Sequence, residues 1–208
     1  MDLDLSGALL GSLVGFPFGV LASFIAWMIV FRWIVPSIVF SKVISKVPPL
    51  TYAKAINEPR YKIKFLNIGR RGIVDVEVMT RLRVRCLSGN QDFVNTWNMV
   101  TLRTDTMREP RIPPGASRSV VLDLEGTPEL GSPLFVSAIN GRDLTLETLL
   151  SLGMDAEVAV WVFGYDDFSG SRKAFVSKEY RLEDIAVGRF NGLVMEPLND
   201  DRHEVSDN

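Results

Sequence analysis

The sequence predicts a mainly β protein, an antiparallel β-sandwich preceded by one N-terminal transmembrane helix. Three observations support this fold class. An uncharged, strongly apolar run lies near the start of the 208-residue chain. From Tyr61 onward, apolar and polar residues alternate with a period of two, which is typical of strands that bury one face. Turn-forming residues recur at intervals of about ten residues, as in antiparallel sandwiches.

The uncharged run covers residues 8–31, which is 24 residues. As a helix that rises about 1.5 Å per residue it would be about 36 Å long, more than the roughly 30 Å hydrocarbon core of a bilayer. A signal peptide is the alternative. The preceding segment MDLDLS, however, is acidic rather than basic, and the apolar run is too long for a signal peptide. Residues 1–34 are therefore predicted to form a transmembrane anchor.

Charges on the two sides of the run predict its orientation. Asp2 and Asp4 precede it. The basic residues that follow it are Arg32, Lys42, Lys46 and Lys54. The positive-inside rule then places the N-terminus outside and the rest of the chain in the cytoplasm, at an inner or plasma membrane. The same basic residues are candidate contacts for anionic lipid head groups, with topology-setting charge as the alternative.

Residues 35–58 are predicted to be a juxtamembrane amphipathic segment and linker. Apolar and basic positions within residues 38–46 suggest an amphipathic helix along the cytoplasmic face of the membrane. Pro48 and Pro49 would end this helix, because the residue before a proline is disfavoured in helical conformation.

Small residues recur at every fourth position of the apolar run. They are Gly7, Gly11, Gly15, Gly19 and Ser23. Positions four apart share one face of a helix, and small residues on a face let membrane helices approach closely. We therefore predict homo-oligomeric packing through this face. The alternative is a lone helix with incidental glycines, since membrane helices are rich in glycine.

A β domain is predicted over residues 59–195. The strand at residues 74–86 places Val76, Leu82 and Cys86 on one buried face, and IGRRG (68–72) would join it to YKIKFLN (61–67) as a hairpin. Further strands are predicted in RSVVLDLEG, in AEVAVWVFG as a central strand, and in RKAFVSKEYR. DLTLETLLSLG is predicted to be a helix that begins at Asp143 or Thr145 and ends at Gly153. Residues 196–208 are predicted to be a disordered acidic tail.

Composition argues against several functions. The net charge of −2 gives no indication of nucleic-acid binding. One cysteine, Cys86, and one histidine, His203, cannot supply a disulfide or a Cys/His zinc site. Asp166 and Asp167 are paired carboxylates, but in YDDFSGS they are typical of a turn. We therefore expect no enzyme activity, catalytic residue, metal or cofactor.

Several motifs recur in the order and spacing of a known family. In the first strand pair they are Asn67, Arg70, Ile73 and Glu77, followed by the segment GSPLF. Near the C-terminus they are Glu157, Gly164, Tyr180, Asp184, Ile185, Gly188 and Phe190. Together, over about residues 35–195, they resemble the cytoplasmic domain of inward-rectifier potassium channels. The resemblance implies an immunoglobulin-like form of the sandwich and a four-fold assembly.

The chain departs from that family where ions would be selected. No T-x-G-Y-G filter occurs, and the stretch before VGFPFG (14–19) is too short for an outer helix and a pore helix. The expectation is a membrane-anchored homo-oligomer, with a tetramer favoured by the resemblance. It would act as a regulatory or sensory scaffold, or as a simplified, poorly selective pore. The alternative is a monomeric adaptor whose sandwich binds a partner protein or a small ligand.

Overall fold

Strands hold more residues of the described chain than helices do. The computed structural model describes residues 5–29, 35–48, 59–87, 95–105 and 107–196, with side chains in the first helix from Gly15 onward. The helical elements are α1 (Leu5–Met28), η3 (Pro128–Gly131), α2 (Pro133–Ile139), α3 (Leu146–Leu150) and η4 (Leu182–Asp184). The strands are β1 (Ile38–Phe40), β2 (Ile44–Val47), β3 (Arg60–Asn67), β4 (Ile73–Arg85), β5 (Trp97–Thr104), β6 (Arg108–Ile112), β7 (Ser117–Asp123), β8 (Asp155–Asp166), β9 (Arg172–Val176), β10 (Ile185–Val187), β11 (Arg189–Asn191) and β12 (Val194–Glu196). The predicted mainly β class is confirmed.

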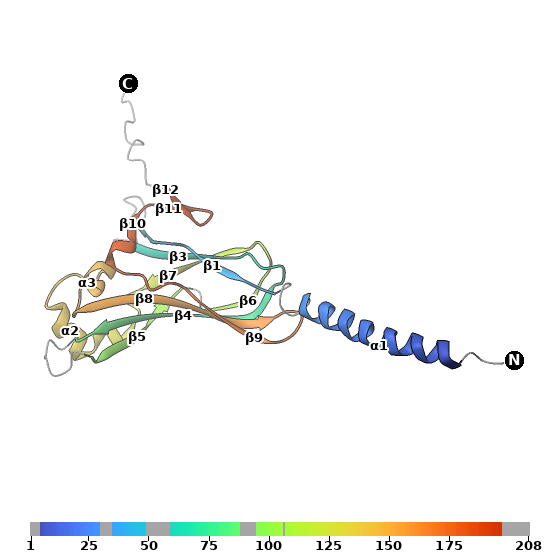
Figure 1. The fold of residues 1–208 in the computed structure, drawn as a ribbon. Helices are drawn as coiled ribbons and strands as arrows, with labels where there is room; N and C mark the ends of the chain where they lie inside the picture. The colour runs from blue at the N-terminus through green and yellow to red at the C-terminus, as the bar shows by residue number, and fades with distance from the viewer. Residues whose placement is uncertain (1–4, 30–34, 49–58, 88–94, 106, 197–208) are drawn as a thin grey trace, which may run out of the picture.

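Ten strands form one curled sheet in the order β10-β2-β3-β7-β5-β4-β8-β9, with β1 beside β3 and β6 beside β4. The β10–β2 pair is parallel, and the other pairs in this sheet are antiparallel. β7 and β5 pair only through Arg103–Asp123 and Thr104–Leu122, and at this narrow junction the sheet folds over (Figure 1). The half with β3 and β7 then lies across from the half with β4 and β8.

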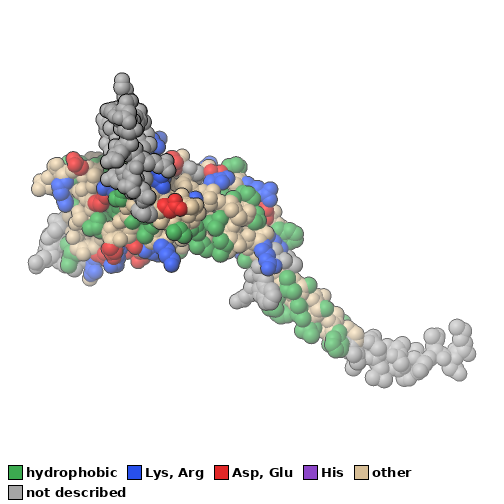
Figure 2. Space-filling view, turned by 90° about the horizontal axis from the view of Figure 1, so that it is seen from above, with side chains coloured by type: hydrophobic (Ala, Val, Ile, Leu, Met, Phe, Trp, Pro, Cys, Tyr) green, Lys and Arg blue, Asp and Glu red, His purple; other side chains and the backbone are tan. Residues whose placement is uncertain are grey.

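Helix α1 lies outside the curled sheet and carries a line of hydrophobic side chains (Figure 2). Pro17 lies within the helix. The first turn holds no acidic residue, and the last turn holds no basic residue. Among the described residues, no helix has both the length and the apolar character that a membrane crossing requires. The predicted tail, apart from Glu196, lies outside the described residues. Arg32 and Lys54 also lie outside them.

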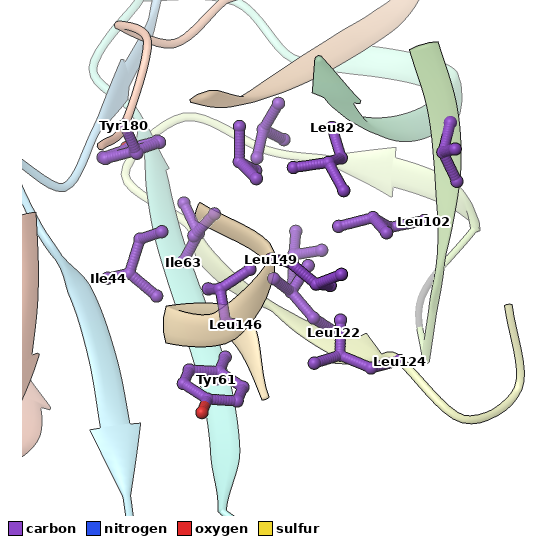
Figure 3. Close-up of a cluster of buried hydrophobic side chains, with 14 of the residues drawn as sticks. Ile44, Tyr61, Ile63, Leu82, Leu102, Leu122, Leu124, Leu146, Leu149 and Tyr180 are labelled. Atoms are coloured by element: carbon purple, nitrogen blue, oxygen red, sulfur yellow. The ribbon is translucent and has the colours of Figure 1, made fainter. Parts of the chain in front are cut away.

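Alternating side chains of both halves meet in one hydrophobic core. β3 contributes Tyr61, Ile63 and Phe65, while β4 contributes Val76, Val78, Leu82 and Val84. Helix α3 closes the core with Leu146 and Leu149, as Figure 3 shows. The predicted strands in β7, β8 and β9 are confirmed, including the central position of β8 between β4 and β9.

The predicted helix around residue 146 is also confirmed. The Thr145 hydroxyl oxygen caps α3 by accepting a hydrogen bond from the Thr148 amide at 3.2 Å. After the helix, Gly153 adopts a φ of +63°, and a Cβ there would clash with the Arg85 carbonyl. Glycine is required at this turn for both reasons.

The buried face of β4 begins later than predicted. A β-bulge lies between Val74 and Glu77, and Asp75 within it has a φ of +49°. Ile73 is therefore buried instead of Val74, and the predicted alternation holds only from Val76 onward, with Cys86 buried as expected. A bulge inserts one residue into the strand and so shifts which residues face the core.

The predicted hairpin between residues 61–67 and β4 is wrong. β3 pairs with β1, β2 and β7, whereas β4 pairs with β5, β6 and β8. Loop 68–72 instead carries the chain from one half of the sheet to the other. Both strands bury alternate residues in the same core from opposite sides, so their alternation could not distinguish a crossover from a hairpin.

The amphipathic helix predicted around residues 38–46 is also wrong. These residues form β1 and β2, so the sheet already begins at Ile38. Ile44 and Ser45 are both fully buried, which a membrane-surface helix would not require. β-Branched residues fill this stretch and favour strands over helices, because their side chains are restricted against a preceding helical turn.

Candidate functional site

The glycine positions all lie on α1. A Cβ added at Gly15 or Gly19 would meet nothing within 4 Å, so this face is open in the single chain. The Ser23 hydroxyl donates a hydrogen bond to the Gly19 carbonyl at 2.9 Å, which removes its need for a partner outside the helix. Among the described residues, none lies against Gly15 or Gly19. The packing role of Gly7, Gly11, Gly15, Gly19 and Ser23 stays a prediction.

The predicted lipid-contact residues are not gathered into one site among the described residues. Lys42 is exposed in the turn between β1 and β2. Lys46 lies opposite Tyr61 in the β2–β3 ladder and forms an ion pair with Glu147 on α3. Its ammonium group already has a carboxylate partner within the domain.

Glu147 joins Lys46 and Tyr61 in a small polar cluster at the edge of the core. The Tyr61 hydroxyl donates a hydrogen bond to the second carboxylate oxygen of Glu147. Burial, together with this hydrogen bond, raises the pKa of Tyr61. Desolvation opposes ionisation of Glu147, but the hydrogen bonds from Lys46 and Tyr61 outweigh it and hold the Glu147 pKa below its usual value.

Replacing Glu147 with glutamine tests this cluster. The ionised carboxylate stabilises the fold above the ordinary glutamate pKa of about 4.3, and that stabilisation is lost as the pH falls through the lower folded-state pKa. We expect Glu147→Gln to cost about 1–2 kcal/mol at neutral pH and progressively less at acid pH. Urea unfolding of both proteins across this pH range measures the difference. A penalty that stays constant with pH would contradict the cluster's electrostatic role.

Asn67, at the end of β3, joins three segments at one end of the domain. It is fully buried. Its Oδ1 accepts hydrogen bonds from the amides of Ser37 (3.3 Å) and Gly69 (3.0 Å). Its Nδ2 donates to the carbonyls of Arg71 (2.8 Å) and Ile112 (3.2 Å). One amide side chain therefore fixes where the chain enters the domain, the crossover loop and the end of β6.

The crossover loop packs directly against residues 35–37, which precede β1. A Cβ at Gly69 would lie 2.5 Å from the Val35 carbonyl oxygen, so only glycine allows this approach. The Ile68 amide donates to the Ser37 carbonyl at 2.8 Å. On the other side, the Gly115 amide donates to the Asn67 carbonyl at 2.8 Å. We name segments 35–37, 68–72, 113–115 and 167–171 the loop end.

Asp166 and Asp167 shape the β8–β9 turn of the loop end. Asp166 Oδ1 accepts hydrogen bonds from the amides of Phe168 (2.9 Å) and Ser169 (3.3 Å), and Asp166 Oδ2 lies 3.5 Å from Arg71 Nη1. Against the desolvation of burial, these contacts lower the pKa of Asp166. Asp167 pairs with Arg111 at 2.8 Å. The two carboxylates are thus turn-forming groups, as their sequence context predicted.

Two large apolar side chains project from these loops. Phe168 is 68% exposed and Ile68 is 57% exposed. The Arg71 guanidinium lies over the Phe168 ring, 4.1 Å from its centroid. Figure 2 shows basic and hydrophobic side chains where the domain approaches α1. Neither apolar residue was predicted to be functional. The available signal was an apolar residue inside a turn otherwise made of Gly, Ser, Asp and Arg.

A second candidate surface covers the outer face of β4, β5 and β8. A hollow of about 520 Å³ is lined there by Arg81, Arg83, Met99, Trp161 and Glu179, among others. Arg83 is the centre of this face. It pairs with the buried Glu157 and, at 2.6 Å, with Glu179, and its guanidinium lies 5.3 Å from the ring centroid of Trp97.

Glu157 has an unusual environment for a carboxylate. It is only 2% exposed, although it lies on the outer parity of β8. Desolvation raises its pKa, and the negative charge of Glu179 adds to the effect, so that Arg83 compensates only in part. A glutamate inside the otherwise apolar run AEVAVWV was the signal in the sequence, but the prediction gave it no role.

In the part of the chain that the structure describes, no three His, Cys, Asp or Glu side chains are placed to hold a metal ion. No protein-family profile and no characterised protein sequence matches the chain. The loop end and the outer face are therefore interpreted from their own geometry.

Proposed function

We propose that this chain is a single-span membrane protein, in which the uncharged run of residues 8–31 crosses the bilayer, with the N-terminus outside and the β domain in the cytoplasm. The apolar surface of α1 carries the proposal. Phe16, Phe18 and Trp27 are 74%, 67% and 57% exposed in the single chain. Residues 8–31 hold no charge. A helix that is apolar on all sides requires lipid or other helices around it.

The protein assembles as a homo-oligomer through the glycine face of α1, and serves as a regulatory or sensory scaffold or as a simple, poorly selective pore. The open space at Gly15 and Gly19 supports close approach of a neighbouring helix. The resemblance to inward-rectifier cytoplasmic domains favours a tetramer. It also suggests that the two facing halves of the curled sheet form an immunoglobulin-like sandwich.

Cross-linking in native membranes tests the assembly. We expect Gly11→Leu and Gly15→Leu to abolish the cross-linked oligomer, because a leucine side chain on this face keeps the helix backbones apart. Val20→Phe is the matched control. Successive residues of an α-helix are rotated by about 100°, so position 20 lies on the side of α1 opposite Gly11 and Gly15. Phenylalanine there should leave the oligomer intact. An unchanged cross-linking ladder in both glycine variants would overturn the packing proposal.

Two further measurements separate the parts of the proposal. Resistance of the protein to carbonate extraction tests the membrane anchor. Planar-bilayer recording then separates a pore from a scaffold. Currents that discriminate poorly between ions support the pore, whereas a stable oligomer that stays silent at all voltages leaves the scaffold.

The outer face favours a second candidate, a monomeric membrane-anchored adaptor. Trp and Arg are enriched in protein-binding hot spots, and Met is enriched in interfaces as a whole. Trp161, Met99 and Arg83 line one hollow here. An adaptor predicts that the glycine variants change nothing, while Trp161→Ala weakens partner binding.

A further inference from the structure

Strand β9 forms an open edge of the ten-stranded sheet. It is the last strand after β8, and among the described residues no other strand pairs with it (Figure 1). Its five residues pair with β8 from Trp161↔Val176 to Tyr165↔Arg172. The unpaired backbone groups of such an edge can hydrogen-bond to an added strand. The edge is therefore a candidate site for an extended peptide.

The hydrogen bonds that flank β9 show which of its backbone groups point outward. Before the strand, the Asp166 amide donates to the Ser171 carbonyl at 2.9 Å. After it, the Ser177 amide donates to the Val160 carbonyl at 2.9 Å. In an antiparallel ladder, opposite residues alternately exchange both backbone hydrogen bonds or none. Because the pairs just before and just after β9 are bonded, alternate residues within it point outward. The residues whose amides and carbonyls point away from β8 are Arg172, Ala174 and Val176.

The side chains of these three residues lie on the outer face of the sheet. Arg172 and Ala174 are exposed, and Val176 is 51% exposed. Ala174 lies opposite Phe163 on β8, and Val176 lies opposite Trp161. The Phe163 and Trp161 rings stack with their centroids 6.1 Å apart. A large apolar side chain of an added strand can therefore cover the small Ala174 and extend toward these rings.

The edge is also basic. Arg172 and Lys173 are neighbours in β9, and neither forms an ion pair with a described carboxylate. The Arg172 guanidinium lies 5.7 Å from the centroid of the Phe163 ring. Basic residues on an edge strand disfavour the pairing of two copies, because like charges are brought together. The same residues favour an acidic strand, since opposite charges across a strand pair stabilise it.

We infer that β9 binds an extended acidic peptide of another protein as an added antiparallel strand. A large apolar side chain of the peptide lies over Ala174, and its carboxylates lie opposite Arg172 and Lys173. In this mode of recognition the backbone hydrogen bonds give affinity and the side chains give specificity. The inference goes beyond the proposed span and assembly, because it uses no residue of α1.

Fluorescence anisotropy of a labelled synthetic peptide tests the inference with the full chain in detergent. The peptide core is valine, threonine, leucine and two glutamates, in that order. As an antiparallel strand it places the leucine opposite Ala174 and the glutamates opposite Lys173 and Arg172. We expect saturable binding. A methyl group on the leucine nitrogen removes the donor to the Ala174 carbonyl and should weaken binding about tenfold. Equal binding of the methylated peptide, or no binding of the unmodified one at millimolar concentration, would overturn the inference.

Ala174→Pro tests the same contact from the side of the protein. The residue 174 amide does not bond to β8, so proline should leave the urea-unfolding midpoint nearly unchanged while it lowers peptide affinity about tenfold. Ala174→Ser is the matched control, because it keeps the amide and should bind the peptide normally. Equal affinity of the two variants would contradict the added strand.

Charge reversal tests the acidic character of the partner. The double variant Arg172→Glu, Lys173→Glu should lose affinity for the glutamate peptide and prefer a peptide with two lysines in their place. An unchanged preference for the glutamate peptide would show that these two side chains do not select the partner.

Ala174→Cys tests whether a second copy occupies the edge instead. Two antiparallel β9 strands centred on residue 174 would bring the two cysteines within disulfide reach, whereas Cys86 is buried. We expect no disulfide-linked dimer. A dimer that the glutamate peptide prevents would assign the edge to self-association and overturn the inference. Gly11→Leu and Gly15→Leu should leave peptide affinity unchanged, so that failure of the proposed assembly and failure of the peptide contact are observed separately.

Discussion

Replacing Asn67 with leucine is expected to destabilise the β domain by about 4 kcal/mol. Asn67 is fully buried and makes four side-chain hydrogen bonds. Leucine has a similar size but cannot form any of them. The amides of Ser37 and Gly69 and the carbonyls of Arg71 and Ile112 would lose a partner together. Each buried polar group left without a hydrogen bond costs about 1–3 kcal/mol, partly relieved where water can reach it.

Urea unfolding of the full chain in detergent, monitored by tryptophan fluorescence, measures this loss of stability. Asn67→Asp should fold poorly as well, since a carboxylate would face two carbonyl oxygens. Ile68→Ser is the control, because Ile68 is 57% exposed and its side chain is not part of the network. A loss of less than about 1 kcal/mol in Asn67→Leu would show that the three segments are held together by other contacts.

Local patterns predicted the strands that lie within one half of the sheet. β8 is predicted as a central strand because a nearly continuous apolar run is typical of a strand whose two faces are both buried. Helix α3 was recognised because its capping threonine and its terminal glycine act within a few residues of the helix. Such features depend on steric contacts and hydrogen bonds between residues that are close in the sequence, so a short stretch of sequence is enough to predict them.

The errors concern features that depend on distant parts of the chain. The spacing of apolar and basic positions in residues 38–46 predicts an amphipathic helix, because the strands that pair with this stretch, β3 and β10, lie elsewhere in the sequence. The bulge at Asp75 is visible only once β8 is placed beside β4. Alternation specifies that a strand buries one face, but it does not identify the strand beside it.

The candidate site shows the same difference between local features, which the sequence predicts, and features that depend on distant residues, which it does not. Asn67 was noticed only through the family resemblance, since an asparagine at the end of a strand gives no sign of four buried hydrogen bonds. Phe168 and Ile68 were overlooked because single exposed apolar residues are common. Their significance comes from the crossover and the β8–β9 turn, which bring residues 100 positions apart to one end of the domain.

The second large effect is expected on the outer face, at the pair formed by Arg83 and Glu157. Arg83→Met keeps the length of the side chain but leaves the Glu157 carboxylate buried without its cation. Removing one partner of a buried ion pair typically costs 3–5 kcal/mol, and we expect about 3 kcal/mol here because Arg83 is 38% exposed. Urea unfolding at neutral pH measures the loss.

The pH dependence distinguishes this electrostatic cost from lost packing against Trp97. The Glu157 pKa is already raised by desolvation, and without Arg83 it should rise further. A group with a raised folded-state pKa contributes stability below its unfolded pKa and loses it as the pH rises through the folded value. Arg83→Met should therefore be most destabilising near neutral pH, and its stability should approach that of the unsubstituted protein toward about pH 4.

The double variant Arg83→Met, Glu157→Gln should regain most of the lost stability at all pH values, because the amide carries no charge to bury. A penalty that is equal at both pH values, and that Glu157→Gln does not relieve, would assign the effect to the arginine's contact with Trp97 instead.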